Sequence, residues 1–296
     1  MQHGLAWTPD DVDIERPSVA RMYDYFLGGS HNFASDRDLA KQAQEVFPDA
    51  PHVVRANRSF LGRAVAALCA LGVDQFLDLG SGIPTVGNVH EIVAAHRSGA
   101  RTVYVDSDPV AVAHASALLR DTDRVAVVHA DLRNPDAVLR GAVETGELGL
   151  SIPTAVLLVS VLPFVPDEDD PARIVAAYRD ATVPGSYLAI SHGTNDYRPK
   201  QVGEVENVYA KTTQPGVFRG KTEVERFFDG YELLEPGLVD IIHWRPEPAA
   251  LAADPLGGDV ARYSLIAGSA ADAAEGLRLV CGWSAATGGG PKRDPR

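Results

Sequence analysis

The hydrophobic pattern of the chain indicates, near residue 76, a buried strand that ends in a glycine turn. A short apolar run reaches Leu79 and breaks at Gly80, Ser81 and Gly82, which is typical of a parallel strand covered on both faces. After Pro84, apolar residues recur at helical spacing, at positions 86, 89, 92 and 93. A second apolar run, residues 103–105, then ends at an acid. This order predicts a strand–turn–helix–strand unit.

The same patterns predict helices over most of residues 16–71 and several later strands. Helices are expected at residues 17–27, 36–45, 52–71, 171–181 and 222–228, and further strands at 125–129, 154–160, 186–191, 231–238 and 263–267. Residues 195–220 carry mixed helical and loop signals. We therefore expect a loose arm over residues 1–15, a helical cap over 16–72, an α/β domain over 73–285 and a flexible tail over 286–296.

Three acids, Asp78, Asp106 and Asp131, lie at the ends of three successive predicted strands. A carboxylate at position 106 can accept hydrogen bonds from both hydroxyls of a ribose, and one at 131, beside Leu132, can accept from an adenine amino group. A negative charge at Asp78 would repel a pyrophosphate but attract ammonium and sulfonium groups. Because the third glycine of a dinucleotide-binding turn is also missing, the pattern favours S-adenosylmethionine over NAD.

Longer stretches of the chain resemble one known family. The resemblance is carried by RPSVARMYDYFLGGSHNFASDR at residues 16–37, RANRSFLGRAV at 55–65, DLGSGIPTVGNVHE at 78–91 and LLVSVLPFVPDEDDP at 157–171. These motifs are similar to those of the bacterial S-adenosyl methyltransferase family, first catalogued as a domain of unknown function, within the class I Rossmann-like methyltransferases. The chain departs from the family pattern at Ser30-His31, where Lys-Asp is common, and at Pro163, where His is common.

The resemblance implies a doubly wound, mostly parallel α/β sheet of seven strands with an antiparallel last strand, beneath an N-terminal helical cap. It implies an enzyme that uses S-adenosylmethionine and releases S-adenosylhomocysteine. The motifs and the resemblance together predict cofactor contacts at Tyr23, Asn32, Arg58, Asp78, Gly80, Ser81, Gly82, Asp106, Ser107, Asp108, Asp131, Leu132 and Ser160. Tyr23 also fits a role in the core, because aromatic residues of an amphipathic helix commonly pack there.

A general base is required only if the methyl acceptor must lose a proton before or during attack. His192, at the end of the fifth predicted strand, is the first candidate, and His31, in a glycine-flanked loop, is the second. A histidine near a strand end can equally serve structure alone.

Composition limits the remaining possibilities. The 296 residues are 45% hydrophobic, enough for one large domain with a cap. A formal net charge of −13 disfavours nucleic acid as a regular partner. Cys69 and Cys281 lie in apolar stretches and are expected to be buried thiols, so no metal site is predicted. Because neither a leader segment nor a membrane span is evident, we expect a cytoplasmic protein.

The segment after the fourth predicted strand narrows the choice of acceptor. Ser160 to Phe164 reads SVLPF, whereas enzymes that methylate an amino nitrogen of nucleobases or glutamine often carry Asn/Asp-Pro-Pro-aromatic there. The sequence therefore predicts transfer to a small molecule. Three alternatives stay open at this point: a protein that binds the cofactor as a sensor or partner without turnover, an enzyme that uses the same cofactor for other chemistry, and an NAD-linked oxidoreductase. The pattern does not determine the acceptor atom or the oligomeric state.

Overall fold

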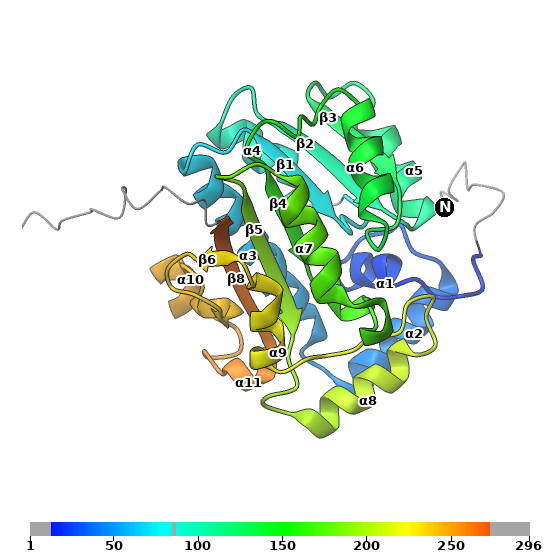
Figure 1. Cartoon of the computed structure of the whole chain (residues 1–296). Helices are drawn as coiled ribbons and strands as arrows, with labels where there is room; N and C mark the ends of the chain where they lie inside the picture. The colour runs from blue at the N-terminus through cyan, green and yellow to red at the C-terminus, as the bar shows by residue number, and fades with distance from the viewer. Residues whose placement is uncertain (1–12, 85–86, 273–296) are drawn as a thin grey trace, which may run out of the picture.

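A computed structural model describes residues 13–84 and 87–272 of the chain. Eight strands of the described residues form one sheet in the order β3-β2-β1-β4-β5-β8-β6, and β7 pairs with β8 (Figure 1). β1 to β5 run parallel, and β8 is antiparallel to β5, β6 and β7. Their bounds are β1 Gln75–Leu79, β2 Arg101–Asp106, β3 Val125–His129, β4 Ala155–Val159, β5 Tyr187–Gly193, β6 Tyr231–Leu233, β7 Val239–Asp240 and β8 Leu265–Asp272. The predicted doubly wound sheet with an antiparallel last strand is confirmed, and the two-residue β7 is an addition to the seven strands expected.

Helices cover both faces of this sheet. The main helices are α1 Val19–Phe26, α2 Ala34–Val46, α3 Ala50–Ala70, α4 Val89–His96, α5 Pro109–Leu118, α6 Pro135–Glu144, α7 Pro171–Ala181, α8 Pro199–Tyr209 and α9 Lys221–Glu225, with the short α10 Pro248–Ala252 and α11 Val260–Tyr263 near the end. Buried residues of α6, α7 and α9 form one apolar cluster with the sheet, and those of α3, α4 and α5 form another. The molecule is therefore a three-layer sandwich.

The burial of β1 explains its sequence. All five of its residues are buried, because successive side chains of a strand point to opposite faces and both faces are covered by helices. Phe76 packs in the cluster with α3, whereas Leu77 packs in the cluster with α6 and α7. β1 is therefore a central parallel strand that carries apolar side chains on both of its faces.

The cap consists of segments that are far apart in the sequence. α1, α2, the first turns of α3 and α8 share a third apolar cluster that includes Met22, Phe26, Leu39 and Val208. α3 then continues into the sheet core, where Phe60 and Leu68 are fully buried. α3 thus takes part in both the cap and the sheet core, and α8 joins the cap from the second half of the chain (Figure 1). The division of the chain into cap and domain at residue 72 stays a prediction.

Some predicted boundaries differ from the structure. α4 begins at Val89 rather than directly after Pro84, because Asn88 and Glu91 cap it there: Glu91 accepts a hydrogen bond from the Asn88 N–H at 2.8 Å. Residues 1–12 of the predicted arm, Val86, Cys281 and the predicted tail at 286–296 lie outside the described residues. Within the described part, no helix has the length and apolar character that crossing a membrane requires.

Two leucines, one in the last turn of α3 and one directly after it, test the core assignment. Leu68 is 1% exposed and Leu71 is 50% exposed. We expect Leu68→Ala to lower the free energy of unfolding by about 2–5 kcal/mol, since it leaves a cavity between helix and sheet. Leu71→Ala is the matched control and should change it by about 0.5 kcal/mol or less. Chemical denaturation of both variants measures this, and equal losses would contradict the packing described.

Candidate functional site

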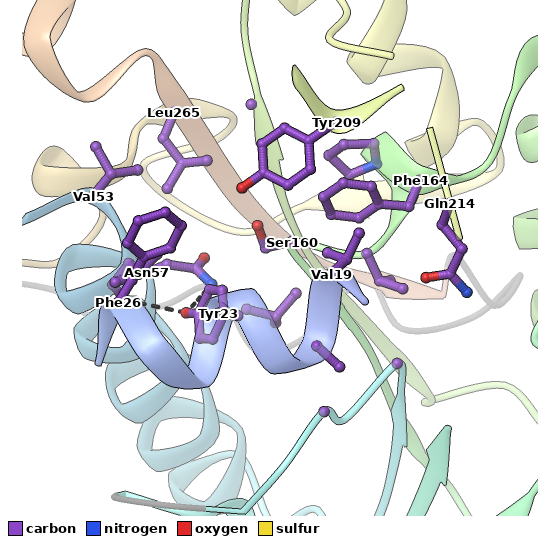
Figure 2. Close-up of a pocket in the computed structure, with 18 of the residues that line it drawn as sticks. Val19, Tyr23, Phe26, Val53, Asn57, Ser160, Phe164, Tyr209, Gln214 and Leu265 are labelled. Carbon is purple, nitrogen blue, oxygen red and sulfur yellow. Dashed lines mark hydrogen bonds between the residues drawn. The ribbon is translucent and has the colours of Figure 1, made fainter. Parts of the chain in front are cut away.

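A cavity of about 210 Å³ lies at the carboxyl ends of the parallel strands, beneath the cap. Its floor is formed by the residues that follow β1, β2, β3 and β4, and its walls by α1, α3 and α8. Figure 2 shows Val19, Tyr23 and Phe26 of α1 directed into this space, with Tyr209 and Phe164 on the opposite side. Ligands of open α/β sheets bind at this edge, so the cavity is the candidate site.

The glycine turn after β1 is held close to the end of β2. The N–H groups of Gly80 and Ser81 donate to the carbonyl of Val105 at 2.8 and 3.1 Å. Gly80 has φ +71°, and a Cβ at this position would lie 2.2 Å from the side chain of Val161. A residue other than glycine would therefore strain the backbone and collide with the loop after β4.

Two buried carboxylates stand beside this turn. Asp106 accepts hydrogen bonds from the N–H of Gly82 at 2.7 Å and of Asp108 at 2.8 Å. Burial raises the pKa of Asp106 to about 6, although these hydrogen bonds oppose the shift. Burial also raises the pKa of Asp78 to about 7, with the charge of Arg58 opposing the shift and that of Asp106 adding to it.

Arg58 brings a positive charge to the same end of the cavity. It extends from α3 and lines the cavity together with Asp78 and Gly82. Its Nε atom is buried and has no hydrogen-bond partner among the described residues. A buried donor of this kind is costly unless a ligand or water satisfies it. The site therefore offers the carboxylate of Asp78 and the guanidinium of Arg58 to the two charges of a zwitterionic group.

The third acid, Asp131, lines the cavity with Leu132 but is already paired. Its carboxylate accepts from Arg133 Nε at 2.9 Å and from Nη2 at 2.5 Å. Burial alone would raise the pKa of Asp131, but the hydrogen bonds from Arg133 outweigh it and lower the pKa overall.

Most of the predicted cofactor contacts meet in this cavity. The residues that line it are Tyr23, Arg58, Asp78, Gly80, Ser81, Gly82, Asp106, Ser107, Asp131, Leu132 and Ser160. Asn32 and Asp108 are not among its lining residues. Asn32 donates to Asp24 and to the carbonyl of Gly29 at 2.8 and 3.0 Å, so it organises the loop after α1.

Asp108 likewise acts on the protein itself. Its side chain accepts from the N–H groups of Val110 and Ala111 at the start of α5 and from the hydroxyl of Ser18. It therefore caps a helix and ties the cap to the cofactor loop. The geometry does not support the predicted direct cofactor contacts of Asn32 and Asp108.

The geometry also does not support His192 as a general base. The ring is fully buried and absent from the cavity lining. Its Nδ1 lies 2.6 Å from the carbonyl of Gly193, and its Nε2 lies 3.2 Å from a guanidinium nitrogen of Arg219. Because the guanidinium can only donate, Nε2 accepts and Nδ1 carries the proton. Burial lowers the pKa of His192 to about 3, so the ring is held neutral with both nitrogens engaged.

His31 stands outside the cavity lining as well. The backbone N–H of His31 donates to Asp24 at 2.8 Å, and its ring centroid lies 4.1 Å from that of His114 in an edge-on arrangement. The ring thus packs against α5 and the loop after α1. Of the two departures from the family pattern, Ser30-His31 therefore lies in this loop and not in the cavity wall. The other, Pro163, lines the cavity.

The contribution of α8 to the site could not be predicted from the sequence pattern. Val202, Val205 and Tyr209 line the cavity from this helix. Their spacing of three and four residues is the signal of an amphipathic helix, but it does not say which surface the helix covers. Only the return of residues 199–218 over the strand ends places them opposite α1.

Comparisons with known proteins agree with this geometry. Residues 5–271 match the family model described as S-adenosyl methyltransferase. The chain belongs to this family. A DUF574 family protein from Streptomyces avermitilis MA-4680 is 37% identical, with 88% of this chain and 99% of that one covered and a TM-score of 0.83. A protein from Thermobifida fusca YX with a provisional methyltransferase name is 37% identical over 91% of this chain and 100% of its own, also with a TM-score of 0.83.

The curated proteins contain no match to this chain. The family identifies the protein as a methyltransferase that depends on S-adenosylmethionine. The site fits that cofactor on its own terms: the glycine turn leaves room for a backbone approach, the buried Asp78 suits the positive charges, and the unpartnered Nε of Arg58 suits a carboxylate.

The raised pKa of Asp78 predicts that cofactor affinity depends on pH. An ionised carboxylate at this position would attract the ammonium group, and burial raises the pKa of Asp78 to about 7 in the protein without cofactor. The affinity for S-adenosylhomocysteine should therefore be highest above pH 7 and should fall by up to about tenfold for each pH unit below it.

Calorimetric titration across this pH range measures the effect. Asp78→Asn is the control: it should bind weakly throughout and lose most of the dependence near pH 7, leaving that of Asp106 near pH 6. A wild-type affinity for S-adenosylhomocysteine that stays constant as the pH is lowered from above 7 to 6 would contradict the role of Asp78.

Proposed function

We propose that the protein transfers a methyl group from S-adenosylmethionine to a small molecule held under the cap. The observation that supports this most directly is the continuity of the cavity. One space extends from the acids of the glycine turn to an apolar region between α1 and α8. A donor at the first end and an acceptor at the second would then share one enclosed volume.

We divide the cavity by the chemistry of its lining. The acidic end is lined by residues 78, 80–83, 106–107 and 130–133 together with Arg58. The acceptor end is lined by α1, the first turns of α3, α8 and residues 163–164, 214, 218 and 263–265. Ser160 lies between them, at the end of β4. This division assigns the cofactor to the first part and the acceptor to the second.

Within the acidic end we assign separate contacts. Asp106 would hold the ribose hydroxyls, because each of its oxygens accepts one backbone N–H and keeps further acceptor capacity. Leu132 and Asp131 would contact the adenine. Arg58 would bind the carboxylate of the amino-acid portion through a charge-assisted hydrogen bond, with Asp78 near the ammonium.

The chemistry needs little from the protein beyond alignment. The sulfonium supplies an activated methyl group, so the side chains have to orient the acceptor atom in line with it and exclude water. The cap suits this task because its helices bury an apolar cluster over the strand ends. A net charge of −13 further favours a small acceptor over a nucleic acid.

Replacement of Asp106 tests the ribose assignment. Asp106→Ala should weaken binding of S-adenosylhomocysteine by about 2–4 kcal/mol, roughly 30- to 1000-fold, because it removes hydrogen bonds to a charged acceptor. Asp123→Ala, an exposed acid before β3, is the control and should bind normally. Thermal unfolding of both variants separates loss of contact from loss of the fold. Unchanged affinity in Asp106→Ala would refute the assignment.

The proposed function is tested by calorimetric titration with S-adenosylmethionine, S-adenosylhomocysteine and NADH. We expect both adenosyl ligands to bind in the micromolar range, about −8 kcal/mol, and NADH not to bind. Methyl transfer is then followed by mass spectrometry with a panel of small acceptors. Tight binding of the adenosyl ligands with no turnover on any acceptor would instead favour a cofactor-binding sensor. Absence of adenosyl binding would overturn the proposal.

A further inference from the structure

The acceptor end of the cavity is uncharged and mostly apolar. The side chains that line it include Val19, Phe26, Phe47, Val53, Val202, Val205, Phe164, Phe218 and Leu265. The charged residues among the described lining of the whole cavity are Arg58, Asp78, Asp106, Asp131 and Arg133, and all five belong to the acidic end. An ionic acceptor would therefore lose its hydration without gaining a counter-charge, which is costly.

Most of the polar side chains at this end are already bonded within the protein. The Tyr23 hydroxyl donates to the carbonyl of Val54 at 3.1 Å and accepts from Asn57 at 2.9 Å. Asn57 in turn accepts from the hydroxyl of Ser191 at 2.5 Å, and Gln201 donates to the carbonyl of Val46 at 2.8 Å. These groups stiffen the wall and have limited capacity to bind an acceptor.

Two hydroxyls are exceptions, one at this end and one at its boundary with the acidic end. Tyr209 on α8 and Ser160 after β4 line the cavity, and neither side chain has a hydrogen-bond partner among the described residues. Figure 2 shows both side chains entering the space between α1 and the strand ends. The Tyr209 ring is braced by Phe164, with ring centroids 5.5 Å apart. Ser160 holds a left-handed backbone with φ +59°, a strained conformation for a residue with a side chain.

Neither hydroxyl can act as a base near neutral pH. Burial, with the neighbouring Tyr23 adding to it, raises the pKa of Tyr209 to about 12, and a serine hydroxyl does not ionise without a partner. His192 has both ring nitrogens engaged, His31 lies outside the lining, and the carboxylates of the cavity belong to the acidic end that we assign to the cofactor. The acceptor end therefore offers no side chain that could take a proton from the acceptor before attack.

We propose that the acceptor is an uncharged ring compound with a weakly basic amine, whose N–H groups donate to the hydroxyl oxygens of Tyr209 and Ser160. This inference rests on the proposed function and specifies its acceptor. The nitrogen lone pair forms the bond to the methyl carbon while the carbon–sulfur bond breaks with its electron pair left on sulfur. The ammonium that results loses its proton to water, so no protein base is needed.

The test uses the full chain saturated with S-adenosylhomocysteine and three probes of similar size. Aniline is neutral at pH 7, benzylamine is cationic and benzoate is anionic. Aniline should bind at least about tenfold more tightly than either charged probe, because the acceptor end provides hydrogen bonds but no counter-charge. Equal or tighter binding of a charged probe would overturn the inference, and so would failure of aniline to bind.

Paired tyrosine variants test the role of Tyr209. Tyr209→Phe should weaken aniline binding by about tenfold and leave the affinity for S-adenosylhomocysteine unchanged. Tyr25→Phe is the matched control, because Tyr25 packs against the same apolar cluster but does not line the cavity. An equal effect of the two variants would overturn the role of Tyr209.

Turnover of aniline provides an independent readout. With saturating S-adenosylmethionine, the rate should follow the ionisation of aniline alone, without a further inflection from a protein base. An additional inflection that persists in this profile would overturn the base-free step. Loss of S-adenosylhomocysteine binding, in contrast, would refute the proposed function itself, so the two failures are distinguishable.

Discussion

The carboxylate of Asp106 holds together the two loops on which the site depends. It accepts the N–H of Gly82 from the turn after β1 and the N–H of Asp108 from the turn after β2. Each loop is thereby fixed to the other where the parallel strands end. Because the carboxylate is buried, its hydrogen bonds are made in a low-dielectric environment, where their loss is costly. Together with the hydrogen bonds of Gly80 and Ser81 to the Val105 carbonyl, this group fixes the position of the acidic end.

The cap is attached to this floor by polar contacts and closed by apolar ones. The hydroxyl of Ser18 donates to Asp108, and the buried pair of Arg21 and Asp36 holds the start of α1 against the start of α2. The apolar cluster of α1, α2, α3 and α8 then covers the strand ends. A cofactor loop and a cap that share Asp108 are coupled, so the acidic end and the acceptor end are positioned by one connected set of contacts.

The predictions succeeded and failed for physical reasons that differ from residue to residue. The acids at positions 78, 106 and 131 could be placed from sequence, because parallel strands that end together bring their last residues to one edge. Asn32 and Asp108 lie in equally distinctive motifs. The Asn32 side chain, however, hydrogen-bonds within the loop after α1, and the Asp108 side chain caps α5. A motif marks a position near a site but does not reveal whether its side chain faces the ligand or the backbone.

The sequence by itself determined the main helices and strands along the chain, the glycine turn and, through the resemblance of its motifs, the family and the cofactor, because these depend on residues close together in the chain. Only the tertiary structure decided that His192 is held neutral between Gly193 and Arg219, that α8 completes the cap, and that Tyr209 faces the cavity. Each of these depends on contacts between segments far apart in the chain, where side-chain direction and burial are set by packing that no local pattern encodes.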